Sequence, residues 1–298
     1  MLRRPLGETG LAASRIGLGL AALGRPVYID VGRECDLGKE RTRTTMEARC
    51  REVLDAAYAA GIRYLDVARS YGDAEAFLGA WLEVRDPPDV LVGSKWGYTY
   101  VGGWRVDADV QEVKDLSVDA LRRQIAESRR LLGDRLSLYQ IHSATIESGV
   151  FDDHEVLEEL RSLRESGLFL GFSTSGPKQA EAIARGIQER VDGEPLFSTV
   201  QSTWNVLEPS AGPALAEAHA EGRGVLIKEA MANGRLAAPE GPHPWVDVVL
   251  SGAVTVDQVR SNAVAVDLTL PADALSEMDA FAQPPERYWT DRAALPWR

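Results

Sequence analysis

Four side chains capable of proton transfer follow the ends of three successive apolar segments. Asp66 and Tyr71 follow the first, Lys95 the second and His142 the third. If the segments are neighbouring parallel strands of a barrel, their carboxyl ends share one face and the four side chains converge there. Each residue also has an ordinary explanation, as a solvated lysine, a core histidine, a helix cap or a packed tyrosine. Their coincidence at three consecutive strand ends indicates a functional site instead.

The four residue types suit acid–base chemistry at an oxygen atom. A free phenol titrates near about 10, so Tyr71 alone is a weak acid at neutral pH. We expect the ammonium of Lys95 to lower the pKa of Tyr71, with Asp66 holding Lys95 in place. His142 would donate a hydrogen bond to the substrate oxygen. Tyr71 would then be the acid in carbonyl reduction and the base in alcohol oxidation, while a cofactor performs the redox step.

The elements that must position these residues alternate along the chain. Apolar runs typical of strands separate segments with helical spacing of apolar residues. Strands are expected at residues 15–18, 64–67, 90–93, 136–141, 169–172, 199–201, 225–227 and 246–250. Helices are expected at residues 46–60, 74–83, 117–132, 154–166, 178–185, 213–220, 256–263 and 272–282. The helix at 117–132 has the clearest boundaries, with Ser117 as a candidate cap and Gly133 at its end.

Eight strand–helix units predict an α/β fold, a (β/α)8 TIM barrel formed by one domain over residues 1–298. A short N-terminal β-hairpin is expected around residues 6–11. The polar stretch at 25–45 has no periodicity, and its length is typical of a functional loop. Residues 228–245 contain three prolines and no long helical pattern, so the seventh helix is predicted to be shortened or missing.

Motifs along most of the chain resemble those of the aldo-keto reductase superfamily. The residues that match are Leu6 to Gly19, Asp66 to Gly72, Ser94-Lys95 and Leu138 to His142. The resemblance implies that Asp66, Tyr71, Lys95 and His142 form the catalytic tetrad. It also implies NADP or NAD as the cofactor.

The resemblance further implies which residues hold the nicotinamide half of the cofactor. Ser173, its neighbour Thr174 and Gln201 would contact the carboxamide, although the family usually has Asn at the position of Thr174. Gly19 and Leu20, beside Asp66, lie in a glycine-rich strand end, where a backbone can pass close to a ligand. A Rossmann phosphate loop is rejected here, because the third glycine is misplaced and no helix pattern follows.

The seventh strand departs from the family pattern. Lys228, Glu229 and Ala230 stand where the family often has Tyr-Ser-Pro, so the usual aromatic partner of the nicotinamide ring is lost. Trp204 is a substitute for this partner, with core packing as its other interpretation. The following loop, with Gly234 and Arg235, resembles the segment that covers the pyrophosphate.

The adenosine end shows a second departure. NADP-preferring relatives carry cations near Gly252 and Gln258, and this chain lacks both, while Asn262 remains to contact adenine. Fewer charge-assisted bonds would weaken binding of a 2′-phosphate. The hypothesis is therefore that NAD is tolerated or preferred, with Arg235 and Arg260 as alternative phosphate ligands.

Aromatic residues close to Lys95 predict the substrate side. Trp96, Tyr98, Tyr100 and Trp104, together with Tyr28, would line an apolar pocket, or some of them would only anchor loops. The tail residues Tyr288 and Trp289 would close over it. A small-molecule carbonyl or alcohol, planar or ring-bearing, is the expected substrate.

Other functions of a barrel give different expectations. A cofactor-binding regulatory or partner-binding barrel with little turnover is the main alternative, and a shortened seventh helix favours it. A phosphosugar lyase or isomerase would not need the tetrad. No metal is expected, because His142, His154, His219 and His243 lack ligand spacing.

Composition restricts the partners and the location. The formal charge of −12 and pI of 4.9 disfavour nucleic acid and anionic membranes. No apolar run reaches the length of a membrane span, and the N-terminus lacks a signal-peptide core. The two cysteines, Cys35 and Cys50, are expected to be free thiols in the cytoplasm. An oligomer is compatible with these data.

Overall fold

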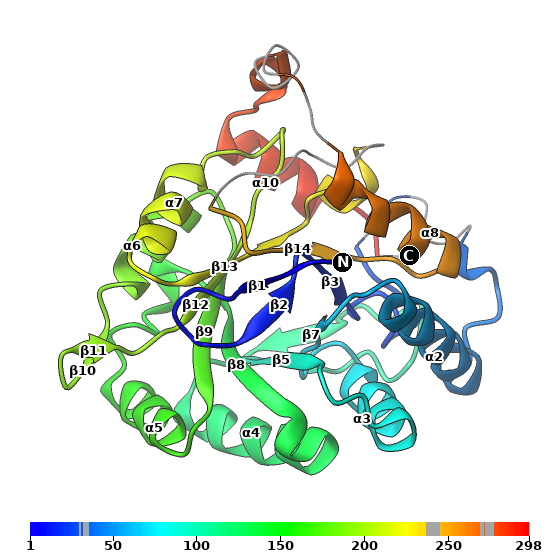
Figure 1. Ribbon diagram of the computed structural model, residues 1–298, viewed down its shortest axis with the longest axis horizontal. Helices are drawn as coiled ribbons and strands as arrows, with labels where there is room; N and C mark the ends of the chain where they lie inside the picture. The colour runs from blue at the N-terminus through cyan, green and yellow to red at the C-terminus, as the bar shows by residue number, and fades with distance from the viewer. Residues whose placement is uncertain (30, 32–35, 237–244, 269–270, 272–276, 298) are drawn as a thin grey trace.

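Eight parallel strands close into a barrel in the computed structural model, which describes residues 1–29, 31, 36–236, 245–268, 271 and 277–297 (Figure 1). The strands follow one another around the barrel in chain order, so the last pairs with the first. They are β3 (Ile16–Gly19), β4 (Tyr64–Asp66), β5 (Leu91–Trp96), β8 (Leu136–Ala144), β9 (Phe169–Thr174), β12 (Thr199–Thr203), β13 (Gly224–Lys228) and β14 (Val248–Ser251). The predicted (β/α)8 fold is confirmed.

Helices surround the barrel and cover its outer surface (Figure 1). They are α2 (Arg43–Ala59), α3 (Ala74–Arg85), α4 (Val118–Leu132), α5 (His154–Glu165), α6 (Gln179–Gly186), α7 (Gly212–Ala220) and α8 (Val256–Ala263). The longer helices bury apolar residues at helical spacing; α2, for example, buries Met46, Cys50, Val53, Leu54 and Ala57. The predicted cap of α4 is confirmed, since the Ser117 hydroxyl accepts from the Ala120 amide over 3.3 Å.

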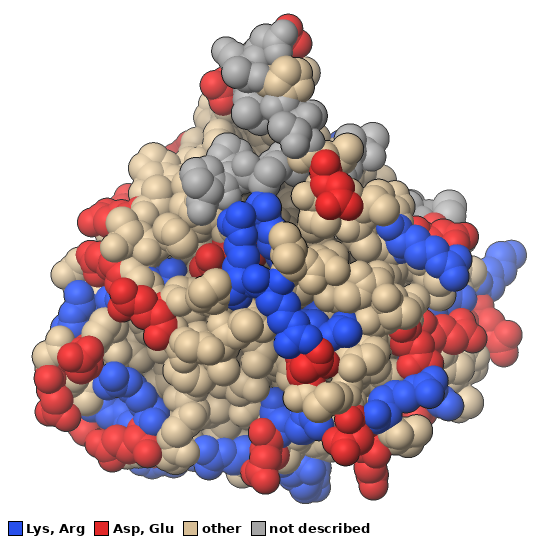
Figure 2. All heavy atoms as spheres, in the orientation of Figure 1, with Lys and Arg blue, Asp and Glu red and all other residues tan. Residues whose placement is uncertain are grey.

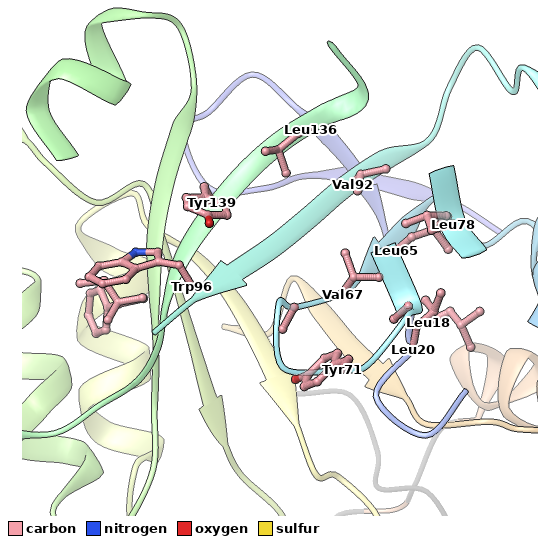
Figure 3. Packing of buried hydrophobic residues seen from close by; sticks show 14 of the residues in the cluster. Leu18, Leu20, Leu65, Val67, Tyr71, Leu78, Val92, Trp96, Leu136 and Tyr139 are labelled. Carbon is pink, nitrogen blue, oxygen red and sulfur yellow. The ribbon is translucent and has the colours of Figure 1, made fainter. Parts of the chain in front are cut away.

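The main core lies between the strands and the helices. Leu65 and Val67 belong to the same buried cluster as Leu78 of α3 and Trp96 at the end of β5 (Figure 3). Burial of this apolar surface supplies the main driving force for closing the barrel inside its helices. Cys50 is buried as a free thiol, as expected, and Cys35 lies outside the described residues.

The N-terminal hairpin plugs the bottom of the barrel. Strands β1 (Arg3–Pro5) and β2 (Ala12–Ser14) pair antiparallel around the predicted turn. Leu6 and Ala13 join a second buried cluster with inward-facing barrel residues, among them Tyr64 and Leu226. Gly7 permits this close approach, because a Cβ at its φ of 53° would lie 2.3 Å from the Gly224 amide nitrogen. The amino-terminal end of the barrel is therefore closed.

The connection from β13 to β14 has no α-helix in its described part. Residues 229–236 and 245–247 form only the 3-10 turn η3 (Ala232–Gly234), and residues 237–244 lie outside the description. Helix α10 (Pro285–Ala293) lies between α7 and α8 in Figure 1, in the sector of this connection. The sequence analysis expected no helix in the proline- and aromatic-rich tail, whereas residues 285–293 form this helix, which Tyr288 anchors as its buried residue.

Several other segments differ from the sequence interpretation. Of the helix expected at 272–282, residues 272–276 lie outside the description, and the 3-10 turn η5 (Asp279–Phe281) follows them. Two short hairpins were not expected. They are β6 (Tyr98–Tyr100) with β7 (Glu112–Lys114), and β10 (Arg190–Val191) with β11 (Glu194–Pro195). The first hairpin rises beside the carboxyl end of β5, where it borders the residues described below.

Charges of both signs are spread over the face shown in Figure 2. Basic side chains gather near its centre, over the N-terminal hairpin, and acidic side chains lie around them. Among the described helices, none combines the length and apolar character needed to cross a bilayer.

Candidate active site

The Lys95 amine is the centre of a buried cluster at the carboxyl ends of β4 and β5. It forms an ion pair with Asp66 and donates to the Tyr71 hydroxyl over 3.2 Å and to the Val67 carbonyl over 3.2 Å. Residues alternate between the two sides of a strand, so Asp66 and Lys95 both point into the barrel mouth. Gln201 of β12 donates to the second Asp66 oxygen over 2.9 Å. The carboxylate is thus fixed from two strands.

A bulge in β8 directs His142 toward this cluster. Ile141 pairs with Phe172, but the next pair joins Ala144 to Thr174, so β8 contains one residue more than β9. An extra residue changes the direction of the side chains beside it. His142 lies within the bulge, and this position explains how a strand residue reaches the barrel mouth.

Aromatic rings hold His142 in place. Its ring centroid lies 5.5 Å from that of Tyr71 and 5.0 Å from that of Tyr98, both edge to face. Its Nδ1 lies 3.5 Å from the Ser70 hydroxyl. Burial and the nearby ammonium of Lys95 lower the pKa of His142 well below its usual value. The imidazole is therefore neutral at neutral pH and can donate one N–H.

Tyr71 does not have the low pKa that the sequence analysis expected. Burial and the negative charge of Asp66 raise the pKa of the phenol well above 10, and the opposing effect of Arg25 is smaller. The expectation failed because it considered only the ammonium of Lys95: burial disfavours the charged phenolate, and the carboxylate of Asp66 adds a negative charge beside it. Tyr71 is consequently protonated at neutral pH.

A cleft of about 390 Å³ opens beside Tyr71 and Asp66. From there it extends along the ends of β13, β14 and β3 to α8. Its lining includes the glycines Gly19, Gly234 and Gly252 as well as Gln201 and Asn262. A Cβ at Gly252 would meet no atom within 4 Å, so this backbone faces open space. Polar side chains line the cleft both beside Tyr71, with Asp66 and Gln201, and beside α8, with Gln258 and Asn262.

Most residues predicted for cofactor binding line this cleft. These are Gly19, Asp66, Gln201, Lys228, Glu229, Ala230, Gly234, Gly252, Gln258 and Asn262. Independently of this cleft, residues 15–241 match the family model described as "Aldo/keto reductase family". The chain belongs to the aldo/keto reductase family.

Relatives of this aldo/keto reductase are distant. An uncharacterized oxidoreductase of Bacillus subtilis is 29% identical over 166 residues, which cover 54% of this chain and 45% of the relative. Pyridoxal 4-dehydrogenase of Microbacterium luteolum is 26% identical over 271 residues, covering 80% and 73%. The chain thus spans less than half of the first relative and about three quarters of the second.

Solved structures agree on the fold. A protein from Pseudomonas aeruginosa assigned to the aldo-keto reductases superposes with a TM-score of 0.67 at 26% identity, and the match covers 89% of this chain and 95% of that one. Together these similarities support the family assignment and its barrel fold.

Four residues predicted for the cofactor do not line the cleft of this reductase. Leu20, Ser173 and Thr174 are fully buried, and Arg235 lies with its guanidinium carbon 4.3 Å from the Tyr288 ring centroid. Ser173 accepts the Ser143 amide over 2.8 Å and therefore supports the bulge in β8. Thr174 likewise has a partner within the protein, since its hydroxyl meets that of Ser202 at 2.8 Å.

The residues that the sequence analysis proposed as a substitute stacking partner and as an alternative phosphate ligand also lie outside the cleft. Trp204 packs edge to face on Trp245, with ring centroids 5.4 Å apart, and does not line the cleft. Arg260 pairs with Asp257 on the exposed side of α8. Neither the aromatic stacking partner nor the alternative phosphate ligand is found where the sequence analysis placed it.

Of the aromatic residues predicted for the substrate pocket, two lie near the catalytic cluster. Tyr28 lines the cleft and Tyr98 contacts His142. Trp96 is completely buried in the core, so its prediction is wrong. Because Lys95 points inward, its neighbour Trp96 must point outward between the strands and helices (Figure 3).

Trp104 and Tyr100 hold loops together and do not line the cleft. The Trp104 indole donates to the Arg41 carbonyl over 2.8 Å, and its backbone N–H donates to the Tyr100 hydroxyl over 3.0 Å. The alternative interpretation of these residues, as loop anchors, is the one the structure supports.

Lys228 and Glu229 form a charged cluster with α10 at the end of β13. The Glu229 carboxylate accepts both the Nε and a terminal nitrogen of Arg292, and Lys228 donates to the Thr203 hydroxyl over 2.8 Å. Burial would raise the pKa of Glu229, but Arg292 and Lys228 outweigh it and lower the pKa to about 2. Burial lowers the pKa of Lys228 to about 8.

Asp36 is a cleft residue that sequence reasoning missed. It comes from the long first loop and accepts a hydrogen bond from the Gln258 side chain over 2.8 Å, which joins that loop to α8. Nothing in the local sequence distinguishes Asp36 from the other charged residues of the loop. Its role follows only from the approach of two segments more than 200 residues apart.

Proposed function

We propose that this aldo/keto reductase is an NAD(P)H-dependent enzyme that reduces an aldehyde or ketone to an alcohol, with Tyr71 as the proton donor. The observation that carries the proposal is the Asp66–Lys95–Tyr71 chain of contacts, with 3.2 Å from the Lys95 amine to the Tyr71 hydroxyl, at the edge of a cleft. The reverse reaction, alcohol oxidation, uses the same groups.

The residues divide the chemistry as follows. A bound nicotinamide would supply the hydride that reaches the carbonyl carbon. The Tyr71 O–H donates its proton to the carbonyl oxygen, and Lys95 stabilises the phenolate that remains. Neutral His142 donates a second hydrogen bond to the same oxygen and orients it. Because the pKa of Tyr71 is raised, the acid is fully protonated for reduction, whereas oxidation first requires the loss of this proton.

Polar groups and glycines along the cleft support a dinucleotide as its ligand. Gln201 and Asn262 would bind its two ends, and the glycines at 19, 234 and 252 let the backbone approach the ligand closely. The open space at Gly252 supports this assignment, because a side chain there would project into the cleft.

NAD fits the cleft better than NADP. The described lining contains three carboxylates, from Asp36, Asp66 and Glu229, and one ammonium, from Lys228. Asp36 lies at the α8 end, where it would accept a ribose hydroxyl and repel a 2′-phosphate. This carboxylate adds to the loss of cations at positions 252 and 258 as support for a preference for NAD.

A ring-bearing aldehyde is the proposed substrate class. Tyr28 and Tyr98 give the region beside Tyr71 and His142 an aromatic character. One distant relative is a pyridoxal 4-dehydrogenase, whose name also indicates a ring-bearing aldehyde.

The test is NADH consumption with a panel of aldehydes. Wild-type protein should turn over, and Tyr71→Phe should lose roughly 10²–10⁴-fold in kcat while NADH still binds. Tyr139→Phe is the matched control, because Tyr139 is a fully buried tyrosine of β8 outside the cleft. NADH binding without turnover of any carbonyl would instead support the alternative function, a cofactor-binding regulatory barrel.

A further inference from the structure

Lys228 occupies an inward position at the mouth of the barrel. Leu226, two residues earlier on β13, belongs to the cluster inside the barrel, and side chains alternate along a strand. Lys228 therefore extends above that cluster, as Asp66 extends above Tyr64 on β4. It lines the same cleft wall as Asp66, Tyr71 and Gln201.

The other charges around this position compensate one another. Asp66 pairs with Lys95, and Glu229 pairs with Arg292. Among the described residues Lys228 forms no ion pair; its amine donates to the Thr203 hydroxyl, which in turn donates to Glu229 over 3.2 Å. The cluster thus carries one uncompensated positive charge, and that charge belongs to Lys228.

A positive charge here would distinguish the two oxidation states of a nicotinamide. The oxidised ring is a cation and the reduced ring is neutral. The hydride must reach a carbonyl whose oxygen lies at Tyr71, so the ring must occupy the cleft wall that Lys228 shares. Two like charges separated by several ångströms in a partly buried site repel strongly.

We propose that Lys228 makes this cleft bind the reduced, neutral nicotinamide more tightly than the oxidised, cationic one. The inference rests on the proposed function, since it requires a nicotinamide in this cleft. Its consequence is rapid release of the oxidised cofactor after carbonyl reduction. Lys228 is a specificity-determining residue here and transfers no proton.

The selectivity should depend on pH. The pKa of Lys228 is lowered to about 8 by burial, so the charge that repels the oxidised ring is present at pH 7 and largely absent at pH 9.5. The charged and titratable groups around Lys228 are Glu229 on β13, Arg292 and Tyr288 on α10, Asp66 and Lys95 across the mouth, and Tyr71, Tyr28 and His142. Of the groups with shifted pKa values, His142 and Glu229 titrate below this range, and Tyr71, Tyr28 and Tyr288 above it.

The experiment measures Kd for NADH and for NAD⁺ by fluorescence titration, without substrate. At pH 7, the ratio of the Kd for NAD⁺ to the Kd for NADH should be about tenfold or more larger in wild-type protein than in Lys228→Met. Binding of NAD⁺ to wild-type protein should tighten between pH 7 and pH 9.5. Lys228→Arg should keep the preference and lose its pH dependence, and Lys178→Met, at an exposed lysine, should behave as wild type.

Each other outcome has a defined meaning. Equal Kd ratios in wild-type protein and Lys228→Met, with both nucleotides bound, would overturn this inference and leave the proposed function intact. Failure of either nucleotide to bind wild-type protein would overturn the proposed function itself. If Lys228→Met does not fold, the pH dependence of the wild-type protein decides alone, and a constant ratio from pH 7 to pH 9.5 refutes the inference.

Discussion

Single side chains determine the electrostatics of the cleft because so many charges there are already paired. Asp66 compensates Lys95, and Glu112 compensates the buried guanidinium of Arg25 over 2.8 Å. Neutral pairs leave the pKa of Tyr71 under the control of burial, which raises it. Among the described residues, neither Lys228 at one end of the cleft nor Asp36 at the other forms an ion pair, so each has a large effect on a charged ligand.

Removing the carboxylate of Asp36 should improve NADP binding. We expect Asp36→Asn to tighten NADPH binding by about tenfold relative to NADH, because a 2′-phosphate no longer meets a negative charge. Parallel fluorescence titrations with both cofactors measure this ratio. Asp257→Asn on α8 is the control, since its carboxylate is almost fully exposed and faces away from the cleft. An unchanged ratio in Asp36→Asn would remove Asp36 from the cofactor site.

At the scale of elements, α10 is held on the barrel by two buried contacts at the ends of β12 and β13. The Tyr288 hydroxyl meets the Asn205 side chain at 2.9 Å, and Arg292 binds Glu229 through two nitrogens. Glu229 also has a left-handed φ of 56°, which is unfavourable for a residue with a side chain. The ion pair and the Asn205 contact to the Glu229 carbonyl, at 2.9 Å, maintain this conformation.

Loss of the Glu229 charge should destabilise the protein in a pH-dependent way. The folded pKa of about 2 lies below the ordinary value of 4.5, so the ionised group stabilises the fold above about pH 4.5 and loses this effect as pH falls toward 2. Glu229→Gln should therefore cost roughly 3 kcal/mol at pH 7 and progressively less below pH 4. Urea denaturation at pH 7, 5 and 3.5 measures the difference.

An exposed ion pair provides the comparison for this prediction. Glu158→Gln removes the partner of Arg161 on the surface of α5, where both side chains contact solvent. It should cost less than about 1 kcal/mol at every pH. If Glu229→Gln were equally mild and insensitive to pH, the buried pair would not be what fixes α10.

The sequence predicted the repeated elements much better than their exceptions. Each barrel strand and most helices show a pattern of apolar residues that local physics explains, and the residues Asp66, Tyr71, Lys95 and His142 were found from strand ends alone. The bulge that turns His142 has no local signature, since it depends on pairing with β9. The direction of the Trp96 side chain has no local signature either. It follows only from the inward direction of its neighbour Lys95, which faces Asp66 in the folded barrel.

Contacts between distant segments were also beyond sequence reasoning. Helix α10 reads as a proline- and aromatic-rich tail, and only its contacts with Asn205 and Glu229 explain why it forms. The pKa of Tyr71 was predicted in the wrong direction for the same reason. The sequence placed Lys95 near the phenol with Asp66 beside it, but it could not show that the phenol is buried, which is the largest cause of its raised pKa.

At the scale of the whole molecule, both ends of the chain contribute to the fold around the site. The N-terminal hairpin closes the bottom of the barrel, and β14 pairs with β3 to complete the circle. At the mouth, the Arg25 guanidinium lies 4.8 Å from the Trp297 ring centroid and 5.1 Å from that of Tyr28. We therefore propose that residues 1–298 act as one domain and that its C-terminal segment supports the wall of the active site.

Trp297 is the residue that tests whether the C-terminal segment supports the active site. Arg25 also lies 5.6 Å from the Tyr71 ring and donates to the Ser70 carbonyl over 3.0 Å, so support from Trp297 is transmitted to the loop of the proton donor.

Trp297→Ala should lower stability by about 1–2 kcal/mol, through lost apolar contact and cation–π attraction. Hydrogen exchange should accelerate at residues 25–29, which include the backbone bridge between Ile29 and Trp297. Reduction should slow several-fold, because Tyr71 becomes less precisely positioned. Phe281→Ala, at an exposed aromatic residue of the same C-terminal region, should change none of these three quantities. Equal effects of the two variants would show that the C-terminal segment does not support the site.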